Sequence, residues 1–474
     1  MGAELHVVLF PFLAQGHMIP ALDIARLLAA RNVKATIITT PVYASMFTKA
    51  IETGRKVGNS YIDLEIFSFP AKEAEIAVKQ PGENQLFFLA NQLLQEQLEQ
   101  YLDRVRPDCL VADMFFPWAT ESSAKFNVPR LVFHGTSYFS LCTQEVVQVY
   151  KPYENVSSDD ETFSLPLIPH EIKLTRSQMP ADLMGDKDNP RQNRMEMIKK
   201  SELESYGVIV NSFYELEPDY AEFYRKELGR KAWHVGPVSL CNRSVEEKAQ
   251  RGKKASIDEH NCLNWLNSKS PASVVYICFG SSAPSFAPQL HEIATALENS
   301  GKNFIWVVRN GDDKGKNDDE WLPSGFEQRT EGRGLIIRGW APQVLILEHA
   351  ALGAFVTHCG WNSTLEGISA GMPMVTWPMF AEQFYNEKLV TDILKIGVSV
   401  GVKKWNGKPS VEELISREVI EAALREITEG DAAEEMRQRA KQLKDKAWKA
   451  VAEGGSSYSD LSALIDELRS YHTR

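Results

Sequence analysis

Residues 340–383 read WAPQVLILEHAALGAFVTHCGWNSTLEGISAGMPMVTWPMFAEQ, and this stretch decides the fold. Two apolar runs with the composition of β-strands, Gly353–Thr357 and Met374–Trp377, flank a short polar helix that begins near Gly360. A strand, a glycine turn and a helix N-terminus in this order present backbone N–H groups and the positive end of the helix dipole. The stretch therefore predicts an α/β unit with an anion-binding site where the first strand meets the helix.

Polar side chains gather where this helix begins. Glu366 follows Asn362 by four residues, so both lie on the same helix face, with Glu366 one turn further in. A carboxylate there suits a pair of sugar hydroxyls, whereas the helix start could hold a diphosphate. The residues expected at the diphosphate are His358, Gly360, Asn362 and Ser363.

The two ends of the stretch could hold the rest of a nucleotide sugar. Trp340 follows a predicted strand and could stack on a base. Glu382 and Gln383 lie just beyond the last strand and add two groups that bind hydroxyls. Each residue alone has an ordinary structural explanation, such as a core Trp, a capping Asn or a surface Glu. Their occurrence in one register favours a nucleotide-sugar site.

The whole stretch resembles the plant secondary product glycosyltransferase signature of the family 1 UDP-dependent glycosyltransferases. The resemblance implies that Trp340 stacks on uracil, that the backbone at Ala341 and Gln343 lies at the uracil edge, and that Glu366 holds the ribose hydroxyls. His358, Asn362 and Ser363 would contact the diphosphate, and Trp361, Glu382 and Gln383 would contact the sugar. A Gln at the last position usually goes with glucose in this family.

Composition is consistent with an ordinary globular protein. The chain has 474 residues, of which 43% are hydrophobic and 24% charged, and this length predicts two or three domains. A net charge of −11 argues against a nucleic-acid partner or a broad face for anionic membranes. No run reaches about 18 apolar residues, so no transmembrane helix is expected.

Six scattered cysteines form no CxxC pair. Four of them lie in apolar runs and are expected to be buried free thiols, namely Cys109, Cys142, Cys278 and Cys359. The N-terminus MGAELHVVLF has no Lys or Arg and so lacks the basic region of a signal peptide, and His6 replaces the Ser or Thr of a myristoylation site. We expect a cytoplasmic protein, and a monomer.

The N-terminal half alternates strand-like and helix-like segments, which predicts a parallel sheet covered by helices. It begins with a strand at Leu5–Phe10, a loop at Pro11–Pro20, a helix at Ala21–Ala30 and a strand at Val33–Thr40. Further strands are expected at Leu64–Phe69, Cys109–Met114, Leu131–Phe133, Gly207–Ser212 and Ala232–Gly236. Further helices are expected at Asn84–Arg104, Trp118–Phe126 and Pro218–Leu228.

A second α/β set follows a polar segment, residues 239–258, that lacks an apolar period and is predicted to be a linker. Its strands are expected at Ser273–Phe279, Asn303–Val308, Gly334–Arg338, Gly353–Thr357, Pro373–Trp377 and Gly397–Val402, with helices only from Ser416 onward. The predicted domains are 1–238 for the acceptor, 259–455 for the UDP-sugar, and a helix at 456–474 that packs back on the first domain. Two Rossmann-like halves would face a cleft at the carboxyl ends of their strands. The family resemblance identifies this α/β arrangement as the GT-B fold.

Two residues of the first half suit acid–base chemistry. His17 follows the first strand, and the positive end of the next helix favours a neutral imidazole, the form a general base needs. Asp113 ends another strand and could hold the tautomer of that imidazole. A His in a Gly/Pro loop is by itself more often structural, but the family's catalytic His and Asp lie at these positions. The resemblance therefore implies that His17 and Asp113 are catalytic.

Three hydroxyl groups follow other strands. Thr136 and Ser137 are candidates for sugar or acceptor contacts, with helix capping as an equally good explanation. Ser281 follows the first strand of the second half and could meet the β-phosphate, again with capping as the alternative. The segment that follows, Ser282–Ser285, differs from the sequence that is usual in the family because it contains an additional Pro.

Several other chemistries lack their motifs. Neither GxGxxG nor GxxxxGK[ST] occurs, and no His/Cys cluster has zinc spacing. Residues 367–371 fit GxSxG, but Ser369 is expected at a helix end, without the strand that a nucleophile elbow needs. The D-x-D at residues 186–188 lies in a polar turn and is expected to be solvated.

These features predict an inverting, metal-independent UDP-sugar glycosyltransferase without a cofactor. The expected substrates are UDP-glucose and a hydrophobic plant metabolite, a triterpenoid, steroid or flavonoid, and the product is a β-O-glucoside. The acceptor would bind in loops of the first domain around Pro11–His17, Gln80–Leu93, Phe115–Phe116, Tyr138–Phe139 and Pro180–Met197. The alternatives are a non-catalytic UDP-sugar-binding protein and a nucleotide-sugar epimerase of the same fold.

Overall fold

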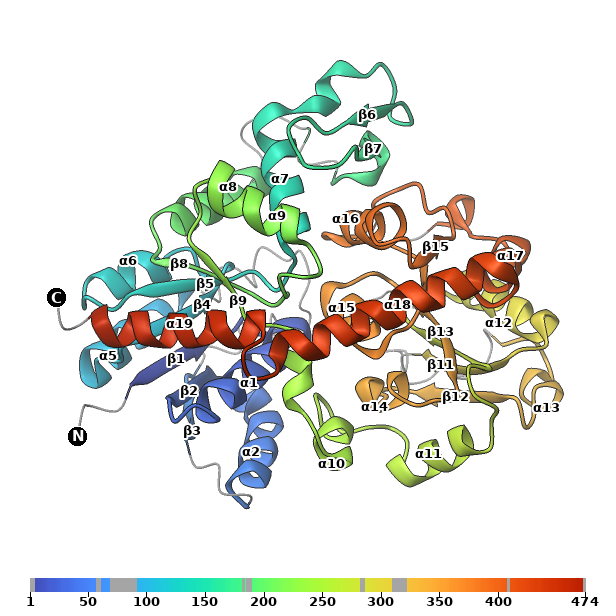
Figure 1. The fold of residues 1–474 in the computed structure, drawn as a ribbon, viewed down its shortest axis with the longest axis horizontal. Coiled ribbons are helices and arrows are strands. Elements are labelled where there is room, and N and C mark those ends of the chain that lie inside the picture. Colours follow the sequence, from blue (N-terminus) through green and yellow to red (C-terminus); the bar gives the residue numbers. More distant parts are fainter. Residues whose placement is uncertain are drawn as a thin grey trace. The chain divides into compact units, whose positions relative to one another are not determined.

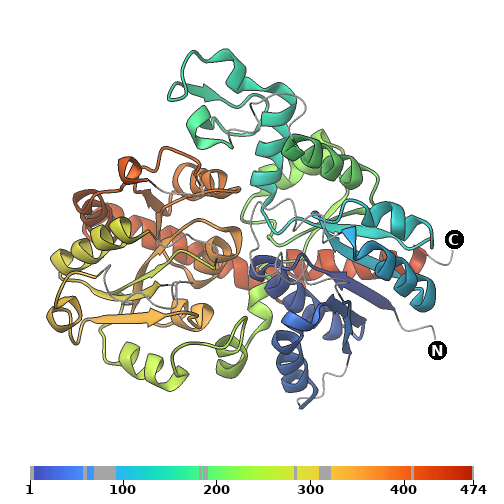
Figure 2. The same ribbon diagram turned by 180° about the vertical axis from the view of Figure 1, so that it is seen from behind.

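The computed structural model describes residues 5–56, 61–68, 92–180, 184, 190–281, 286–308, 322–406 and 410–471. The chain forms two compact units (Figure 1). The first contains residues 1–137, 185–243 and 449–474, and the second contains residues 138–184 and 244–448. Each unit is built on one parallel sheet with helices on both faces (Figures 1 and 2).

The first sheet has the strand order β3-β2-β1-β4-β5-β8-β9. Its strands are parallel and, apart from the half-exposed edge strand β3, mostly buried, because helices cover both faces of the sheet. They are β1 (His6–Phe10), β2 (Lys34–Thr39), β3 (Ile62–Ile66), β4 (Cys109–Asp113), β5 (Arg130–Phe133), β8 (Gly207–Val210) and β9 (Ala232–His234).

Helices of the first unit include the last helix of the chain, α19 (Ser456–Tyr471). Its apolar face is buried with the sheet, and Asp460 Oδ2 accepts hydrogen bonds from the backbone N–H of His234 at 3.1 Å and from Arg225 Nη2 at 2.6 Å. The predicted return of the C-terminal helix to the first sheet is thereby confirmed. Among the described residues, the other α-helices of this unit are α1 (Gln15–Ala29), α2 (Pro41–Lys56), α5 (Gln95–Val105), α6 (Ala119–Ala124), α8 (Pro190–Leu203) and α9 (Pro218–Glu222).

The second sheet has the order β12-β11-β10-β13-β14-β15 and is also parallel. Its strands are β10 (Val274–Cys278), β11 (Asn303–Val308), β12 (Gly334–Arg338), β13 (Leu352–Thr357), β14 (Met374–Thr376) and β15 (Gly397–Ser399). Its helices include α7 (Tyr138–Tyr150), α10 (Val245–Ala249), α11 (Glu259–Asn267), α12 (Ala287–Ser300), α13 (Phe326–Arg329), α14 (Gln343–Leu347), α15 (Trp361–Ala370), α16 (Gln383–Lys388), α17 (Arg417–Thr428) and α18 (Gly430–Val451). A small antiparallel pair, β6 (Thr162–Ser164) and β7 (Lys173–Thr175), belongs to the same unit.

Three expectations need correction. The predicted loop Pro11–Pro20 is wrong, because α1 already begins at Gln15 and contains Pro20, which forfeits only one helical hydrogen bond near the helix start. The predicted strand Leu64–Phe69 lies earlier, at Ile62–Ile66. The predicted linker contains α10, which starts with a capping box of Ser244 and Glu247.

Other expectations fall on the described residues only in part. The predicted helix Asn84–Arg104 corresponds to α5 from Gln95, and residues 84–91 lie outside the described residues, as do residues 186–188 and 282–285. None of the six cysteines, all of which lie within the described residues, forms a disulfide, and five of them are buried. Within the described ranges, no helix is long and apolar enough to span a membrane.

Candidate functional site

Each sheet has one point where the strand order turns from one direction to the other. In the first sheet this point lies between β1 and β4, and in the second it lies between β10 and β13. Ligands of open α/β sheets bind at the carboxyl ends of the strands at such a point. The residues that follow these four strands are therefore the first place to look for chemistry in each unit.

His17 and Asp113 meet at this point of the first sheet. Phe10 of β1 pairs with Ala112 of β4, so the residues that follow both strands reach the same edge. His17 Nδ1 lies 2.6 Å from Asp113 Oδ2, and the Asp113 side chain is fully buried while His17 keeps 21% of its side-chain surface exposed. A buried carboxylate accepts from Nδ1–H, which leaves Nε2 as the unprotonated nitrogen.

Two aromatic rings flank the imidazole. Phe12 makes an edge-on contact with His17 at 5.4 Å between ring centroids, and Phe115 lies 5.7 Å away. Gly135 adopts a φ of +71°, and a Cβ there would lie 3.6 Å from the imidazole. Among the described residues, the imidazole of His17 therefore contacts two aromatic rings and the carboxylate of Asp113.

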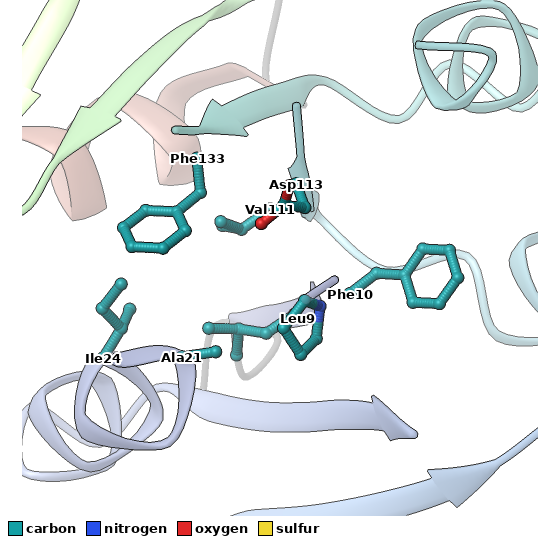
Figure 3. A pocket seen from close by; sticks show the side chains of 8 residues that line it. Leu9, Phe10, Ala21, Ile24, Val111, Asp113 and Phe133 are labelled. Atoms are coloured by element: carbon teal, nitrogen blue, oxygen red, sulfur yellow. The ribbon is translucent and has the colours of Figure 1, made fainter. Parts of the chain in front are cut away.

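Asp113 is held from several sides. Its Oδ1 accepts from the backbone N–H of Phe115 at 3.1 Å, and its carbonyl accepts from Arg130 Nη2 at 2.9 Å. Burial lowers the pKa of Arg130 to about 9, against the opposing charges of Asp113 and Glu202, so Arg130 remains cationic at neutral pH. A small cavity behind Asp113 is otherwise lined by apolar residues, Leu9, Phe10, Pro11, Ala21, Ile24, Val111 and Phe133 (Figure 3). Apolar surroundings lower the local dielectric constant, which strengthens the hydrogen bond between Asp113 and His17.

Gly280, His358 and Gly360 meet at the corresponding point of the second sheet. A Cβ on Gly280 would lie 2.6 Å from the ring of His358, and one on Gly360 would lie 2.4 Å from its Nε2. Burial lowers the pKa of His358 to about 4, so the imidazole is neutral at physiological pH. Its Nδ1 is buried and has no hydrogen-bond partner among the described residues. Ser281 follows Gly280 in the sequence and is exposed.

The N-terminus of α15 follows immediately. Glu382 Oε1 accepts from the backbone N–H of Trp361 at 3.3 Å and from Asn386 Nδ2 at 3.3 Å. The Trp361 side chain is buried. Gln383 Oε1 accepts from the backbone N–H groups of Met379 and Phe380 at 2.8 and 3.1 Å, so its amide NH₂ is the group that could donate to a ligand.

Gln343 and the buried Glu366 form a polar cluster beside Trp340. Gln343 Nε2 donates to Glu366 Oε2 at 2.7 Å and to Ser363 Oγ at 3.1 Å. The second carboxylate oxygen of Glu366 accepts from Arg251 Nη1. The indole of Trp340 donates to the carbonyl of Arg251 at 3.3 Å, and Ala341 is buried next to it.

The structure thus assembles the predicted residues within each unit. His17 and Asp113 are in contact, and residues 340–383 bring Gln343, Ser363 and Glu366 together. Thr136 is buried, and its Oγ1 has no hydrogen-bond partner within the described part of the chain; Ser137 is also buried. Ser369 bonds to the carbonyl of Leu365 inside α15, which confirms that it is no nucleophile elbow.

Sequence reasoning missed two residues of this region. Arg251 lies in the segment predicted to be a linker, and no motif marked it. Asn386 is fully buried and links Glu382 to the carbonyl of Cys359 and the hydroxyl of Ser140. Its only signal was its place four residues after Glu382 in the turn that starts α16.

A family model described as UDP-glucoronosyl and UDP-glucosyl transferase matches residues 3–431. The chain belongs to this transferase family. This UDP-sugar transferase is 53% identical to scopoletin glucosyltransferase of Nicotiana tabacum, over 99% of its own length and 98% of the relative's. It is 52% identical to anthocyanin 3'-O-beta-glucosyltransferase of Gentiana triflora, over 99% of each chain.

Solved structures agree with this membership. A UGT of Glycyrrhiza uralensis complexed with glycyrrhetinic acid 3-O-monoglucuronide matches with a TM-score of 0.90 and 42% identity, over 99% of this chain and 97% of that one. A Medicago truncatula UGT complexed with UDP-glucose matches with a TM-score of 0.80 and 25% identity, over 98% of each chain. The predicted GT-B fold and the predicted UDP-glycosyltransferase activity are confirmed, and the acceptor is a small molecule.

Proposed function

We propose that this UDP-glycosyltransferase transfers glucose from UDP-glucose to a hydroxyl of a hydrophobic plant metabolite, with inversion at the anomeric carbon. The observation that carries the proposal is the 2.6 Å contact between His17 and Asp113. An alcohol or phenol is a poor nucleophile until it loses its proton, and Nε2 of this imidazole can accept that proton. The oxygen then attacks the anomeric carbon opposite the UDP, whose bond to that carbon breaks, and a β-O-glucoside results.

The donor half of the reaction would use residues of the second unit. Burial lowers the pKa of His358 to about 4, so its imidazole is neutral. A neutral imidazole can donate one N–H to the diphosphate. The N-terminus of α15 adds backbone N–H groups and its dipole, and Ser281 adds a hydroxyl. These groups support departure of UDP without a metal, which we propose for this enzyme.

A phenolic acceptor fits the surroundings of His17 best. Phe12 and Phe115 lie 4.5 Å apart and both contact the imidazole, so a flat aromatic ring can pack against them. The relatives named for scopoletin and anthocyanin point the same way. A triterpenoid is the second candidate, because the Glycyrrhiza uralensis structure contains a glycyrrhetinic acid derivative. The proposed acceptor loop Gln80–Leu93 lies largely outside the described residues, as does most of residues 181–189.

The test is mass spectrometry of reactions with UDP-glucose and coumarin, flavonoid, simple phenol, sterol and triterpenoid acceptors. A gain of one hexose on the phenols, absent in His17→Ala, is the expected result. NMR of the product should show a β-linkage, and activity should survive chelation of divalent metals with EDTA. An α-linked product, or full turnover of an alkyl alcohol by His17→Ala, would contradict the mechanism. A non-catalytic UDP-sugar-binding protein would bind UDP-glucose and glycosylate none of the acceptors.

A further inference from the structure

Glu366 has a cationic partner outside the signature stretch. Arg251 Nη1 donates to Glu366 Oε1, and the exposed fractions of the two side chains are 9% and 5%. The other oxygen, Oε2, accepts from Gln343 Nε2 at 2.7 Å. Each oxygen of the carboxylate therefore accepts one of these hydrogen bonds, Oε1 from Arg251 and Oε2 from Gln343.

The segment that carries Arg251 is fastened to Trp340. The Trp340 indole donates to the carbonyl of Arg251 at 3.3 Å, and the backbone of Trp340 exchanges hydrogen bonds with Ser256 at 2.8 and 2.9 Å. A Cβ on Gly339 would lie 2.2 Å from Ser256 Oγ, so the two segments are in close contact. These bonds set the backbone at Arg251, and the side chain then reaches Glu366.

An ionised carboxylate offers about four lone-pair positions, two on each oxygen. Arg251 occupies one position on Oε1 and Gln343 occupies one on Oε2. Within the described part of the chain, one position on each oxygen therefore stays open to a ligand. Two adjacent hydroxyls on one ring, as on a ribose, match an acceptor pair of this kind. The guanidinium charge also offsets the cost of keeping the carboxylate ionised in a buried place.

We propose that Arg251 is a positioning residue for UDP-sugar binding, which orients Glu366 so that the carboxylate accepts both ribose hydroxyls. The inference rests on the proposed role of Glu366. It predicts that Arg251 contributes to nucleotide affinity only when the ribose hydroxyls are present. The opposite arrangement, in which Arg251 competes with the ribose for Glu366, predicts a change of opposite sign.

The experiment compares UDP with 2',3'-dideoxy-UDP by isothermal titration calorimetry, in wild type, Arg251→Ala and Arg251→Lys. Arg251→Ala should weaken UDP binding roughly 10- to 100-fold, and dideoxy-UDP binding by less than about 2-fold. Arg251→Lys keeps the charge but loses the planar fork, so its loss should be intermediate. In turnover, the KM for UDP-glucose should rise while kcat changes little, because the groups at the glucose are untouched.

Lys248→Ala is the matched control. Lys248 Nζ lies 2.6 Å from Glu348 Oε2, so this substitution removes another partly buried ion pair between the same segment and the same unit without touching Glu366. Its affinity for UDP should equal that of wild type. Thermal melts of each variant show whether the fold is retained, and Arg251→Lys decides the question if Arg251→Ala does not fold.

The outcomes separate the two proposals. Failure of wild type to bind UDP would overturn the proposed function itself. If wild type binds UDP, then equal losses for UDP and dideoxy-UDP in the Arg251 variants, or no loss for either, would overturn the positioning role alone. Tighter UDP binding by Arg251→Ala would show that the guanidinium competes with the ribose, and would overturn it as well.

Discussion

His17 Nδ1 and Asp113 Oδ2 lie 2.6 Å apart, although 96 residues separate them in the chain. Strands β1 and β4 are parallel neighbours, so their carboxyl ends lie side by side. The residues that follow the two strands are thereby brought together. Asp113 is buried and also accepts from the N–H of Phe115, so its position is fixed before any ligand arrives. The pair is therefore preorganised to keep Nε2 of His17 ready to accept a proton.

Asp113→Asn should lower kcat about 10²- to 10⁴-fold for an ordinary phenol. The amide keeps the size of the carboxylate but cannot stabilise the imidazolium that forms when His17 takes the proton. Steady-state kinetics with a series of phenols of falling pKa would measure the effect. The loss should shrink for acidic nitrophenols that are already ionised, because they need no base.

Asp63→Asn serves as the control for that experiment. Asp63 lies on β3 of the same unit and pairs with Lys34 at the surface, so its loss should leave kcat unchanged. An equal loss of rate for neutral and ionised acceptors in Asp113→Asn would show that the carboxylate does not act through proton transfer.

The sequence predicted the parallel strands well, because strands buried on both faces are continuous apolar runs. Asn303–Val308 matches the mostly buried strand β11 to the residue, and Gly334–Arg338 also matches β12, although β12 is a half-buried edge strand. The edge strand β3 has the alternating, half-exposed sequence IDLEI, and the apolar run after it misled the prediction. The start of α1 was missed because Pro20 was interpreted as a boundary, although a Pro in the second turn removes only one hydrogen bond.

The residues of the candidate site were likewise predicted only in part from the sequence. His358, Asn362 and Glu366 could be predicted as candidates because they lie on one strand, turn and helix that are continuous in the sequence. Arg251 could not, because its contact with Glu366 spans 115 positions and depends on the path of a polar segment without periodicity. Asn386 was missed because a buried amide that links two loops looks like any other Asn in a helix.

Gly360→Ala should weaken the binding of UDP by displacing the imidazole of His358. The backbone of Gly360 has φ −61° and ψ 138°, which Ala adopts without strain, but the new Cβ would lie 2.4 Å from His358 Nε2. The imidazole must shift, so affinity for UDP should fall several-fold while the melting temperature changes little. Calorimetry and thermal melts measure the two effects.

Two further glycines provide matched comparisons. Gly301 has φ +65° with nothing within 4 Å of a new Cβ, so Gly301→Ala should lower stability by about 1–2 kcal/mol and leave binding intact. Gly280 has φ +75°, and a Cβ there would lie 2.6 Å from the ring of His358. Gly280→Ala should therefore lower both the stability and the affinity for UDP. Normal affinity in Gly360→Ala would mean that His358 does not hold the diphosphate.

Asn386→Asp should impair use of the sugar more than binding of the nucleotide. Asn386 Nδ2 donates to Glu382 Oε1 at 3.3 Å and to the carbonyl of Cys359 at 2.8 Å, and a carboxylate would repel both. We expect kcat/KM for UDP-glucose to fall roughly 10- to 100-fold, with UDP affinity within about 2-fold of wild type. Kinetics and calorimetry on the same preparation check this.

Ser140→Ala is the milder companion of Asn386→Asp. It removes only the hydroxyl that donates to Asn386 Oδ1 at 2.8 Å and leaves both bonds from Nδ2 in place. Its effect on kcat/KM should therefore be the smaller of the two. A parallel loss of UDP affinity in Asn386→Asp would place its effect at the nucleotide instead of the sugar.

Glu387 should make the folded protein lose stability as the pH rises. Burial raises the pKa of this carboxyl from 4.5 to about 7, although Thr376 donates to it at 2.7 Å. The folded state therefore holds a proton that the unfolded state releases between pH 4.5 and 7, and its stabilising contribution is lost across that window. Glu387→Gln stays neutral, so it should be more stable than wild type at pH 8, by up to about 3 kcal/mol, and equal to it near pH 4.5.

The stabilising contribution of His6 changes with pH in the opposite direction, so it must be measured apart from that of Glu387. Burial lowers the pKa of His6 from 6.5 to about 4, so its contribution is complete above pH 6.5 and is lost as the pH falls toward 4. Melting temperatures of wild type, Glu387→Gln and His6→Asn from pH 4 to 8 would separate the pH dependence caused by Glu387 from that caused by His6. Glu426→Gln, at an exposed position, is the control. The difference between Glu387→Gln and wild type should grow with pH between 4.5 and 7, whereas a constant difference would mean that Glu387 is already ionised in the folded protein at pH 4.5.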